Sequence, residues 1–518
     1  MTAPAPSRIA GAAAVITVLT VLSRIAGFGR TFVFLHTVGV GDLANIYNAA
    51  NTIPNIVFEL VAGGALASLV VPLLARPVAA GDRQRVDAIA SSLLTWVLAL
   101  LVPLAVVVAL AAGPIAALLP GVPDDQREVA ASMLRVFAPQ LPLYGIGIVL
   151  TGVLQAHHRF AWPVIAPLLS SVTVMAAYLT YAAVDGARSD FGGLSRTGGL
   201  TLSIGTTVGV VVLALCLLIP LRRLSLRLRP RLRFPGDEGR RAVRLGWAGA
   251  VTVGAQQIVT AIVIALAVSG GLTAFNAAQT VFLLPWAVLA VPLATAVYPA
   301  LSAADDETYA GVLAGTARSV VLLAGLGAAA LAALAVPVAA LLNAPTVAPG
   351  IAALAPGLFG YALFALLSRA LYARGATVAA AVATAAGWAI AAVAAVALDA
   401  VVGEEMIVPA LGLAHALGMT AIGVLLVLAV RRHAGGAALA GLGRATVAGI
   451  VAAGAAALAG WGVVSATAEW LGHPVTRALL SGLLGGVAVL IVYAGVALLL
   501  DRRDVRRLRQ IASRRRRA

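Results

Sequence analysis

Residues 43–76 read LANIYNAANTIPNIVFELVAGGALASLVVPLLAR, and this stretch decides the fold class. A helix needs about 20 mostly apolar residues to cross a bilayer. The stretch exceeds that length, and Glu59 is its only side chain before Arg76 that is charged at neutral pH. It therefore predicts a membrane-spanning helix that carries polar side chains at bilayer depth.

The composition of the whole chain extends this prediction beyond one helix. The 518 residues are 61% hydrophobic and 11% charged, and the mean hydropathy is +1.01. A soluble domain carries roughly 25% charged residues. A soluble fold of this size cannot bury so much apolar surface, so the composition indicates an integral membrane protein.

Apolar runs of spanning length recur along the chain and predict an all-α membrane protein of about fourteen transmembrane helices. The first run could pass for a signal peptide, but apolar segments continue to Leu500, so we expect it to be retained. The expected spans are 9–38, 43–74, 88–119, 129–155, 162–184, 198–221, 245–269, 272–300, 309–342, 350–372, 377–399, 406–430, 437–468 and 478–500.

The arginines predict the orientation, because positive residues accumulate in cytoplasmic segments. The basic residues are 36 arginines and no lysines. With the N-terminus inside, 26 arginines fall in inside segments and four in outside loops, so both termini are expected in the cytoplasm of a bacterial inner-membrane protein. The expected parts are an N-terminal lobe (1–221), a basic linker (222–244), a C-terminal lobe (245–430), two further helices (431–500) and a basic tail (501–518).

The motifs exclude most enzyme classes. The sequence contains no Walker A loop, Rossmann glycine pattern, HExxH motif or nucleophile elbow. Cys216 is the only cysteine, and adjacent His157 and His158 have no plausible ligand companions nearby. We therefore expect no catalytic residues, no cofactor and no metal. The positive charge of the linker and tail fits topology and anionic membrane lipids better than nucleic acid, although a protein-docking role for the linker stays open.

The second apolar run carries a polar stripe. At about 100° per residue, its polar side chains project within one 120° arc of a helix. Such a stripe faces either a water-filled cavity or other helices through amide hydrogen bonds. The glutamate favours the cavity, whereas Val57 and Leu60 should point elsewhere. The stripe comprises Asn45, Asn48, Asn51, Thr52, Asn55 and Glu59.

Two arginines lie within the first apolar run. Arg24 and Arg30 are functional candidates because ionisable residues at bilayer depth are costly. On a regular helix they project about 120° apart. Gly27 and Gly29 lie between them, and a helix break there could turn both arginines to one cavity.

The motifs around these arginines resemble those of the MurJ/MviN family. The segments SRIAGFGRTFVF (23–34) and IPNIVFELVAGGALASLVVPLLAR (53–76) are similar to the opening motifs of that family. VLQAHHRFAWPVIAPLLSS (153–171) resembles a second family block, and a weaker similarity runs from Pro285 to Ser302. Tyr372–Arg374 adds a short fourth match.

The resemblance implies a fold, an activity and roles for the site residues. It implies two six-helix lobes around a central cavity, two C-terminal helices that form a lipid-tail groove, and alternating access. The implied cargo is lipid II, an undecaprenyl-pyrophosphate-linked peptidoglycan precursor. Arg24 and Arg30 would bind the pyrophosphate. Asn48, Asn51 and Asn55 would contact sugar or peptide, and Glu59 would balance charge or couple a cation.

The sequence departs from the family pattern at several charged positions. Thr31 stands where the family commonly has aspartate, and Phe58 and Glu59 stand where it often has arginine. Thr280 replaces a cavity arginine, and Gly63 replaces a glutamate. Alternative functions are a flippase for another polyprenyl-linked glycan, a drug or cation exporter, and a non-transporting scaffold that recruits cell-wall synthesis or division proteins.

Overall fold

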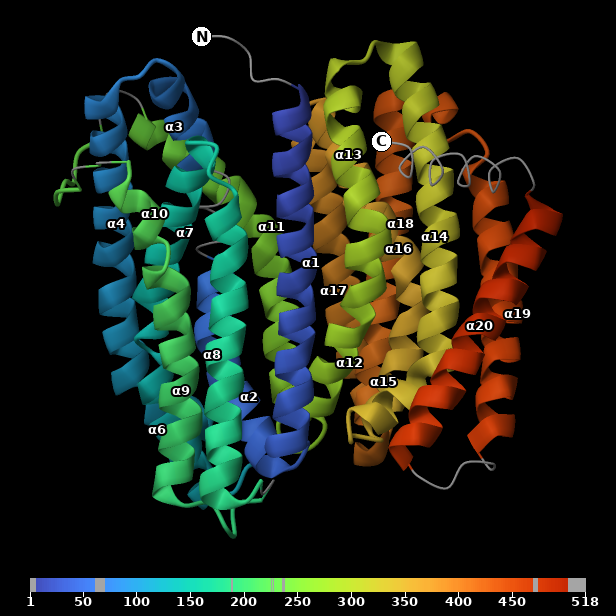
Figure 1. Cartoon of the computed structure of the whole chain (residues 1–518), viewed down its shortest axis with the longest axis horizontal. Coiled ribbons are helices and arrows are strands. Elements are labelled where there is room, and N and C mark those ends of the chain that lie inside the picture. Colours follow the sequence, from blue (N-terminus) through green and yellow to red (C-terminus); the bar gives the residue numbers. More distant parts are fainter. Residues whose placement is uncertain are drawn as a thin grey trace. The chain divides into compact units, whose positions relative to one another are not determined.

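The computed structural model describes residues 6–60, 70–187, 190–224, 226, 228–234, 238–468 and 474–501. These residues form helices joined by short turns (Figure 1). The all-α membrane class predicted from the apolar runs is confirmed. The chain divides between Thr273 and Ala274 into two compact units.

Among the described residues, the first unit holds eleven helices and the first two residues of α12. These are α1 (Pro6–Thr37), α2 (Asp42–Glu59), α3 (Val70–Ala79), α4 (Arg83–Leu110), α5 (Ala112–Ala117), α6 (Asp124–Phe137), α7 (Gln140–Ala156), α8 (Ala161–Asp185), α9 (Arg196–Leu215), α10 (Leu218–Arg222) and α11 (Glu238–Ala267), followed by α12 (Leu272–Pro285).

The second unit continues from α12. Its elements are a π-helical turn η2 (Trp286–Ala290), α13 (Val291–Ala303), α14 (Asp306–Leu341), α15 (Val347–Leu354), a 3₁₀ turn η3 (Ala355–Gly357), α16 (Leu358–Ala373), α17 (Thr377–Asp399), η4 (Glu404–Met406), α18 (Ile407–Ala434), η5 (Gly436–Leu439), α19 (Leu442–Ala468) and α20 (Pro474–Leu500).

Within the described residues, twelve helical stretches are long and apolar enough to cross a membrane. They correspond to twelve of the fourteen expected spans. The other two expected spans contain α2 and α11. α2 ends at Glu59, and residues 61–69 of that expected span lie outside the described part. The apolar portion of α11 is Val253–Ala267. The chain is therefore a multi-pass helical membrane protein.

The helix bounds differ from the expected spans in three places. α1 runs without a break through Gly27 and Gly29, so the expected opening of the helix there is absent. The span expected at 129–155 is two helices, because α6 ends before Pro139 and α7 begins after it. α11 begins at Glu238, within the expected linker, because backbone hydrogen bonds extend a helix beyond its apolar residues. The basic tail after Asp501 lies outside the described residues.

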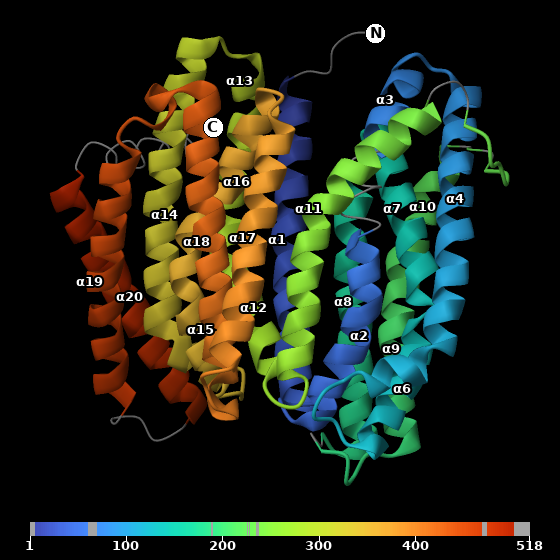
Figure 2. The same ribbon diagram turned by 180° about the vertical axis from the view of Figure 1, so that it is seen from behind.

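In the first unit, the segments that are expected on the cytoplasmic side lie at one end of the helices. The α3–α4, α7–α8 and α9–α10 turns lie at the end where α1 starts, and the α1–α2, α6 and α8–α9 connections lie at the opposite end (Figure 1). Seen from behind, α11 runs beside α2, against which it packs (Figure 2). The arginine-rich turns of this unit therefore share one side, as the orientation argument requires.

A buried polar network fastens α2 to α8 and α9. The Tyr47 hydroxyl lies 2.9 Å from the Tyr178 hydroxyl and 2.6 Å from Thr206 Oγ1. All three side chains are buried, and Phe34 and Phe137 pack around the Tyr47 ring. In a low-dielectric interior these hydrogen bonds are strong, and an unpaired hydroxyl is costly.

We expect Tyr47→Phe to destabilise the protein by about 1–3 kcal/mol, because it leaves a buried Tyr178 hydroxyl without this partner. The change should lower the apparent melting temperature of the purified protein in detergent. Tyr298→Phe is the matched control, since Tyr298 is 37% exposed and its hydroxyl has no hydrogen bond within the described residues. Equal melting temperatures for the two variants would show that the network contributes no stability.

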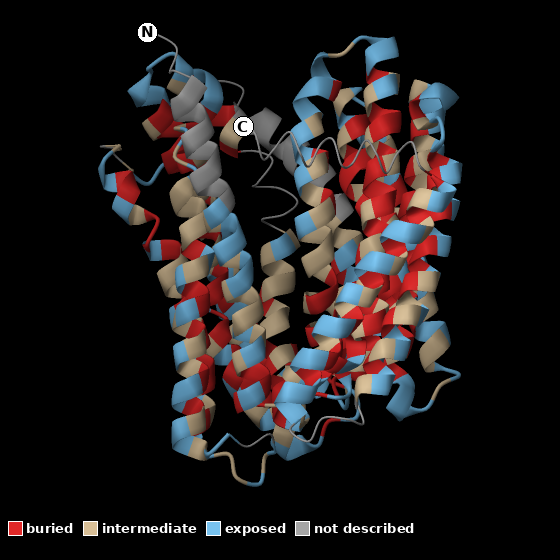
Figure 3. Cartoon of the chain, turned by 45° about the vertical axis from the view of Figure 1, so that its right-hand side comes forward, coloured by how far each residue is buried: buried red, intermediate tan, exposed pale blue. Residues whose placement is uncertain are grey.

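The second unit is built around α14. The helices α19 and α20 pack against each other and against α14, with small residues such as Ala329, Ala333 and Ala452 at the contact. The Arg444 guanidinium binds the buried Asp501 carboxylate at 3.1 Å and joins the start of α19 to the end of α20. Figure 3 shows buried residues along the faces that meet other helices and exposed residues on the outer faces.

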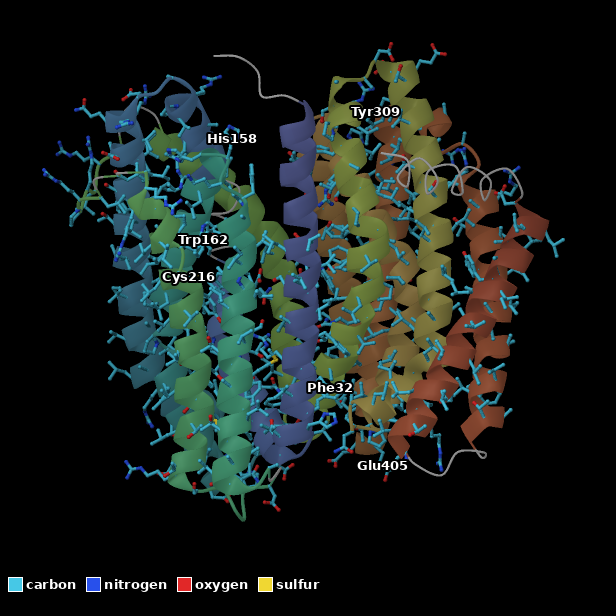
Figure 4. All side chains as sticks on the ribbon, in the orientation of Figure 1. Phe32, His158, Trp162, Cys216, Tyr309 and Glu405 are labelled. Atoms are coloured by element: carbon cyan, nitrogen blue, oxygen red, sulfur yellow. The ribbon has the colours of Figure 1, made fainter. Side chains whose placement is uncertain are left out.

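Arg374 connects the turns at one end of the second unit. Its guanidinium binds Asp306 at 2.7 Å and lies 4.1 Å from the ring centre of Tyr309, which is labelled on α14 in Figure 4. The neighbouring Asp305 side chain caps α14 by accepting from the Thr308 amide at 2.9 Å. The Thr308 hydrogen bonds hold the pKa of Asp305 below its usual value, so the cap stays ionised to lower pH than a free aspartate would.

Candidate functional site

The two arginines of α1 are exposed and lie on one unbroken helix. Because six residues separate Arg24 from Arg30, they project about 120° apart and about 9 Å apart along the axis. α1 packs against α8, where a side chain added at Gly29 would meet Met175. Within the described residues neither arginine has a hydrogen bond or an ion-pair partner. The helix thus carries two cations that no carboxylate neutralises.

Tyr144 of α7 lies within electrostatic reach of both Arg30 and Glu59. The Arg30 guanidinium and the Glu59 carboxylate both act electrostatically on the Tyr144 phenol, and the Phe58 ring lies 4.4 Å from the Tyr144 ring, centre to centre. Arg30 also acts on Tyr47 and on the Tyr178 phenol of the buried network. Arg24 has no such neighbours within the described residues. Arg30 and Glu59 each lie near Tyr144, but no ion pair joins the two within the described residues.

The first half of the α2 stripe makes helix contacts. The Asn45 side-chain oxygen accepts from the Thr273 amide at 2.9 Å. The Asn48 side-chain amide donates to Thr273 Oγ1 at 2.9 Å and to the Ala44 carbonyl at 3.0 Å. These bonds fasten α2 to the start of α12. For Asn45 and Asn48, the structure therefore shows the interhelical amide bonding that was the alternative to a cavity.

The second half of the stripe is differently placed. Asn51 is partly buried, and its side-chain oxygen has no hydrogen-bond partner within the described residues. Asn55 is partly exposed and Glu59 is exposed. Val57, which is not part of the stripe, packs against the apolar core of the first unit. Polar capacity for a ligand therefore lies at Asn51, Asn55 and Glu59.

Tyr144 is a residue that the sequence argument missed. It lines a cavity of about 290 Å³ within the first unit, together with Phe58 and mainly apolar residues of α7, α8 and α9. Thr151 and Gln155 contribute the polar part of this lining. A single tyrosine two residues after Pro142 forms no periodic pattern. Its role depends on which residues of α1 and α2 lie beside it.

The arrangement suits binding rather than bond making. The described residues contain no group of three or more His, Cys, Asp or Glu side chains that could hold a metal ion. His157 bonds to its own helix at Val153, and the labelled His158 lies in the α7–α8 turn (Figure 4). What the site presents is a pair of guanidinium groups, side-chain amides and one carboxylate on membrane-spanning helices.

Comparison with known proteins gives a family match over most of the chain. Residues 34–480 match the family described as "Lipid II flippase MurJ". A Burkholderia cenocepacia protein named lipid II flippase MurJ is 28% identical over 381 residues, which cover 68% of this chain and 71% of that one. A Synechocystis protein named probable lipid II flippase MurJ is 29% identical over 234 residues. That match covers 44% of this chain and 43% of the relative, so the chain spans less than half its length.

Solved structures give the same fold. A structure described as lipid II flippase MurJ in an inward closed conformation has a TM-score of 0.73 at 16% identity, covering 94% of this chain and 98% of that one. An inward-facing multidrug resistance MATE family transporter of the MOP superfamily has a TM-score of 0.63 at 15% identity, with coverages of 82% and 98%. Both likenesses concern the fold.

Proposed function

Because this chain belongs to the lipid II flippase MurJ family, a family of transporters rather than enzymes, we propose that it flips lipid II across the bacterial cytoplasmic membrane by alternating access. The cargo would be an undecaprenyl-pyrophosphate-linked peptidoglycan precursor. Transport would proceed without covalent catalysis and without a bound cofactor. The two-lobe organisation, with a boundary in the basic linker and a separate pair of helices after residue 430, belongs to the same proposal.

One observation carries the proposal: Arg24 and Arg30 lie on a membrane-spanning helix without a carboxylate partner in the described part of the chain. Holding unpaired cations at bilayer depth is costly, so a protein that keeps two of them there needs an anion that arrives with its ligand. A pyrophosphate supplies anionic oxygens that planar guanidinium groups bind through paired, charge-assisted hydrogen bonds. The unneutralised charge therefore supports a lipid-linked pyrophosphate as cargo.

The rest of the stripe supports binding of the polar part of the cargo. The unpaired Asn51 oxygen can accept a hydrogen bond from a sugar hydroxyl or a peptide amide, which would remove a buried unsatisfied group. Asn55 is accessible for the same purpose. Asn48 would act mainly by holding α2 in place through Thr273. Glu59, at the exposed end of the stripe, would balance charge or couple a cation.

The test is rescue of a MurJ-depleted bacterium, with the membrane side of lipid II measured directly. The wild-type chain should restore growth and move lipid II to the outer leaflet. The Arg24→Ala/Arg30→Ala variant should reach the membrane but restore neither. Arg432→Ala is the control, because Arg432 is an exposed arginine at the end of α18. Rescue by the double alanine variant would contradict the proposed pyrophosphate site.

The same assay separates the alternatives. A flippase for another polyprenyl-linked glycan would insert normally but leave lipid II on the inner face. A drug or cation exporter, which the exposed Glu59 carboxylate would suit, would lower drug accumulation and depend on Glu59 rather than on the arginines. A scaffold for cell-wall or division proteins would tolerate loss of both arginines but not loss of the linker.

The arginine distribution also gives a topology prediction. In a Cys216→Ala background, Ala80→Cys should resist a membrane-impermeant maleimide in intact cells, whereas Asp190→Cys should react. Both positions are exposed, and they lie in the α3–α4 and α8–α9 turns. The reverse pattern of labelling would place the termini outside and overturn the expected orientation.

A further inference from the structure

The basic linker forms an ordered strap on α4. The strap, residues 228–234, lies against one face of that helix. The backbone amides of Arg229 and Arg231 donate to Ser91 Oγ at 3.1 Å and to Thr95 Oγ1 at 2.9 Å. Pro230, between them, has no amide hydrogen to satisfy. The strap is thus held through its backbone, and its arginine side chains are left available.

Two further bonds close the strap on α4. Ser92 Oγ donates to the Arg233 carbonyl at 2.9 Å, and the Trp96 indole donates to the Leu232 carbonyl at 2.8 Å. Leu228 and Phe234, at either end of the strap, pack against the core of the first unit. The backbone and the two terminal apolar side chains therefore anchor the strap, while the arginine side chains between them are exposed.

The position of the strap along α4 coincides with the start of a lipid-facing band. Large exposed apolar side chains on α4 begin at Trp96 and continue through Leu100, Val106 and Leu110. No large exposed apolar residue of α4 precedes Trp96. Tryptophan concentrates at the membrane–water interface. The strap therefore crosses α4 at the level where lipid headgroups lie.

At this level the strap presents a mainly apolar hollow beside exposed arginines. Arg229, Arg231 and Arg233 are exposed, and none has a carboxylate partner in the described part of the chain. Arg231 Nε donates to the Arg233 carbonyl at 3.0 Å, which orients its guanidinium group. An open hollow of about 540 Å³ is lined by Thr95, Pro230, Arg231, Leu232 and Arg233. Leu232 is 61% exposed beside it.

We propose that this hollow is a binding site for the phosphate headgroup of an anionic phospholipid. The guanidinium groups of Arg231 and Arg233 bind the phosphate, and the exposed Leu232 and Trp96 side chains contact the adjoining acyl chains. Charge complementarity at the membrane boundary selects this occupant, because basic groups beside a bilayer attract anionic lipids. The site is separate from Arg24 and Arg30 and does not depend on the identity of the cargo.

The proposal is tested on the full-length protein in detergent, with bound lipid counted by native mass spectrometry. Wild-type protein should bind phosphatidylglycerol more tightly than phosphatidylcholine. Arg231→Gln/Arg233→Gln should weaken phosphatidylglycerol binding on the order of 30-fold, about fivefold for each arginine, and leave phosphatidylcholine binding unchanged. Arg431→Gln/Arg432→Gln removes the same charge from the end of α18 and should change binding by less than about twofold.

Three outcomes would overturn the site. Equal affinity of wild-type protein for the two lipids would remove its selectivity, and equal loss in the two double variants would reduce it to net charge. Competition by soluble glycerol phosphate would assign the hollow to free phosphate instead of a lipid. The strap variants should fold, because α4 holds the strap through backbone atoms; a melting temperature equal to that of the wild type confirms this before binding is measured.

Discussion

Replacing Arg30 with alanine should strongly reduce transport while leaving a folded, membrane-inserted protein. The Arg30 guanidinium has no ion-pair partner within the described residues, so removing it breaks no internal salt bridge. A hydrogen bond to a charged group contributes about 1.5–3 kcal/mol, so loss of a paired contact to pyrophosphate should reduce transport roughly 10- to 100-fold. Arg24→Ala should act in the same direction.

The conservative variants distinguish a pyrophosphate contact from a general positive charge. Arg30→Lys keeps the charge but loses the planar, paired donors, so it should also impair transport. A static role in the fold would instead lower stability and activity together. A side chain that only reaches toward water would leave both unchanged. The measurements are lipid II facing, membrane abundance and melting temperature. Normal flipping by both folded alanine variants would leave the cargo assignment resting on family membership alone.

Adding a side chain at Gly360 should have the largest effect on stability. A Cβ atom there would lie 2.1 Å from the Met419 carbonyl oxygen and 2.7 Å from the Thr420 Cα. A Cβ atom added at Gly423 of α18 would lie 2.6 Å from the Gly360 Cα of α16. These neighbours are backbone atoms, so neither can turn aside as a flexible side chain would. Close approach through small residues is how membrane helices pack.

We expect Gly360→Ala to destabilise the protein by at least about 1–3 kcal/mol and Gly360→Leu to prevent recovery of folded protein. Gly454→Ala on α19 is the control, because a Cβ there meets nothing within 4 Å and alanine favours a helix. Thermal unfolding in detergent, followed by size-exclusion chromatography, measures the difference. A Gly360→Ala variant as stable as the control would show that α16 and α18 can separate without cost.

The fold was largely predictable because spanning length and apolar content are local properties. Each apolar run contributes its own transfer free energy, so no tertiary contact is needed to recognise it. Helix ends were less predictable. The backbone can continue a helix into polar residues, as α11 does from Glu238, and Pro139 divides one apolar run into two helices.

The candidate site was predictable as a set of residues but not as a set of contacts. Helical periodicity predicts that the α2 stripe lies on one face. It does not distinguish Asn48, which bonds Thr273, from Asn51, whose side-chain oxygen has no partner within the described residues. Thr273 follows Asn48 by 225 residues. No pattern within one helix reports which distant group will satisfy an amide.

The sequence by itself determined that this chain is a helical membrane protein with two costly cations on its first span, and it favours one orientation. Those properties follow from the transfer free energies of individual side chains and from charge placement. The tertiary structure decided which polar groups are already used. It placed Tyr144 of α7 against Phe58 of α2, and it laid the basic strap on α4 at the start of the lipid-facing band. Hydrogen bonds between segments far apart in the chain fix these arrangements, and their partners are chosen only when the helices pack.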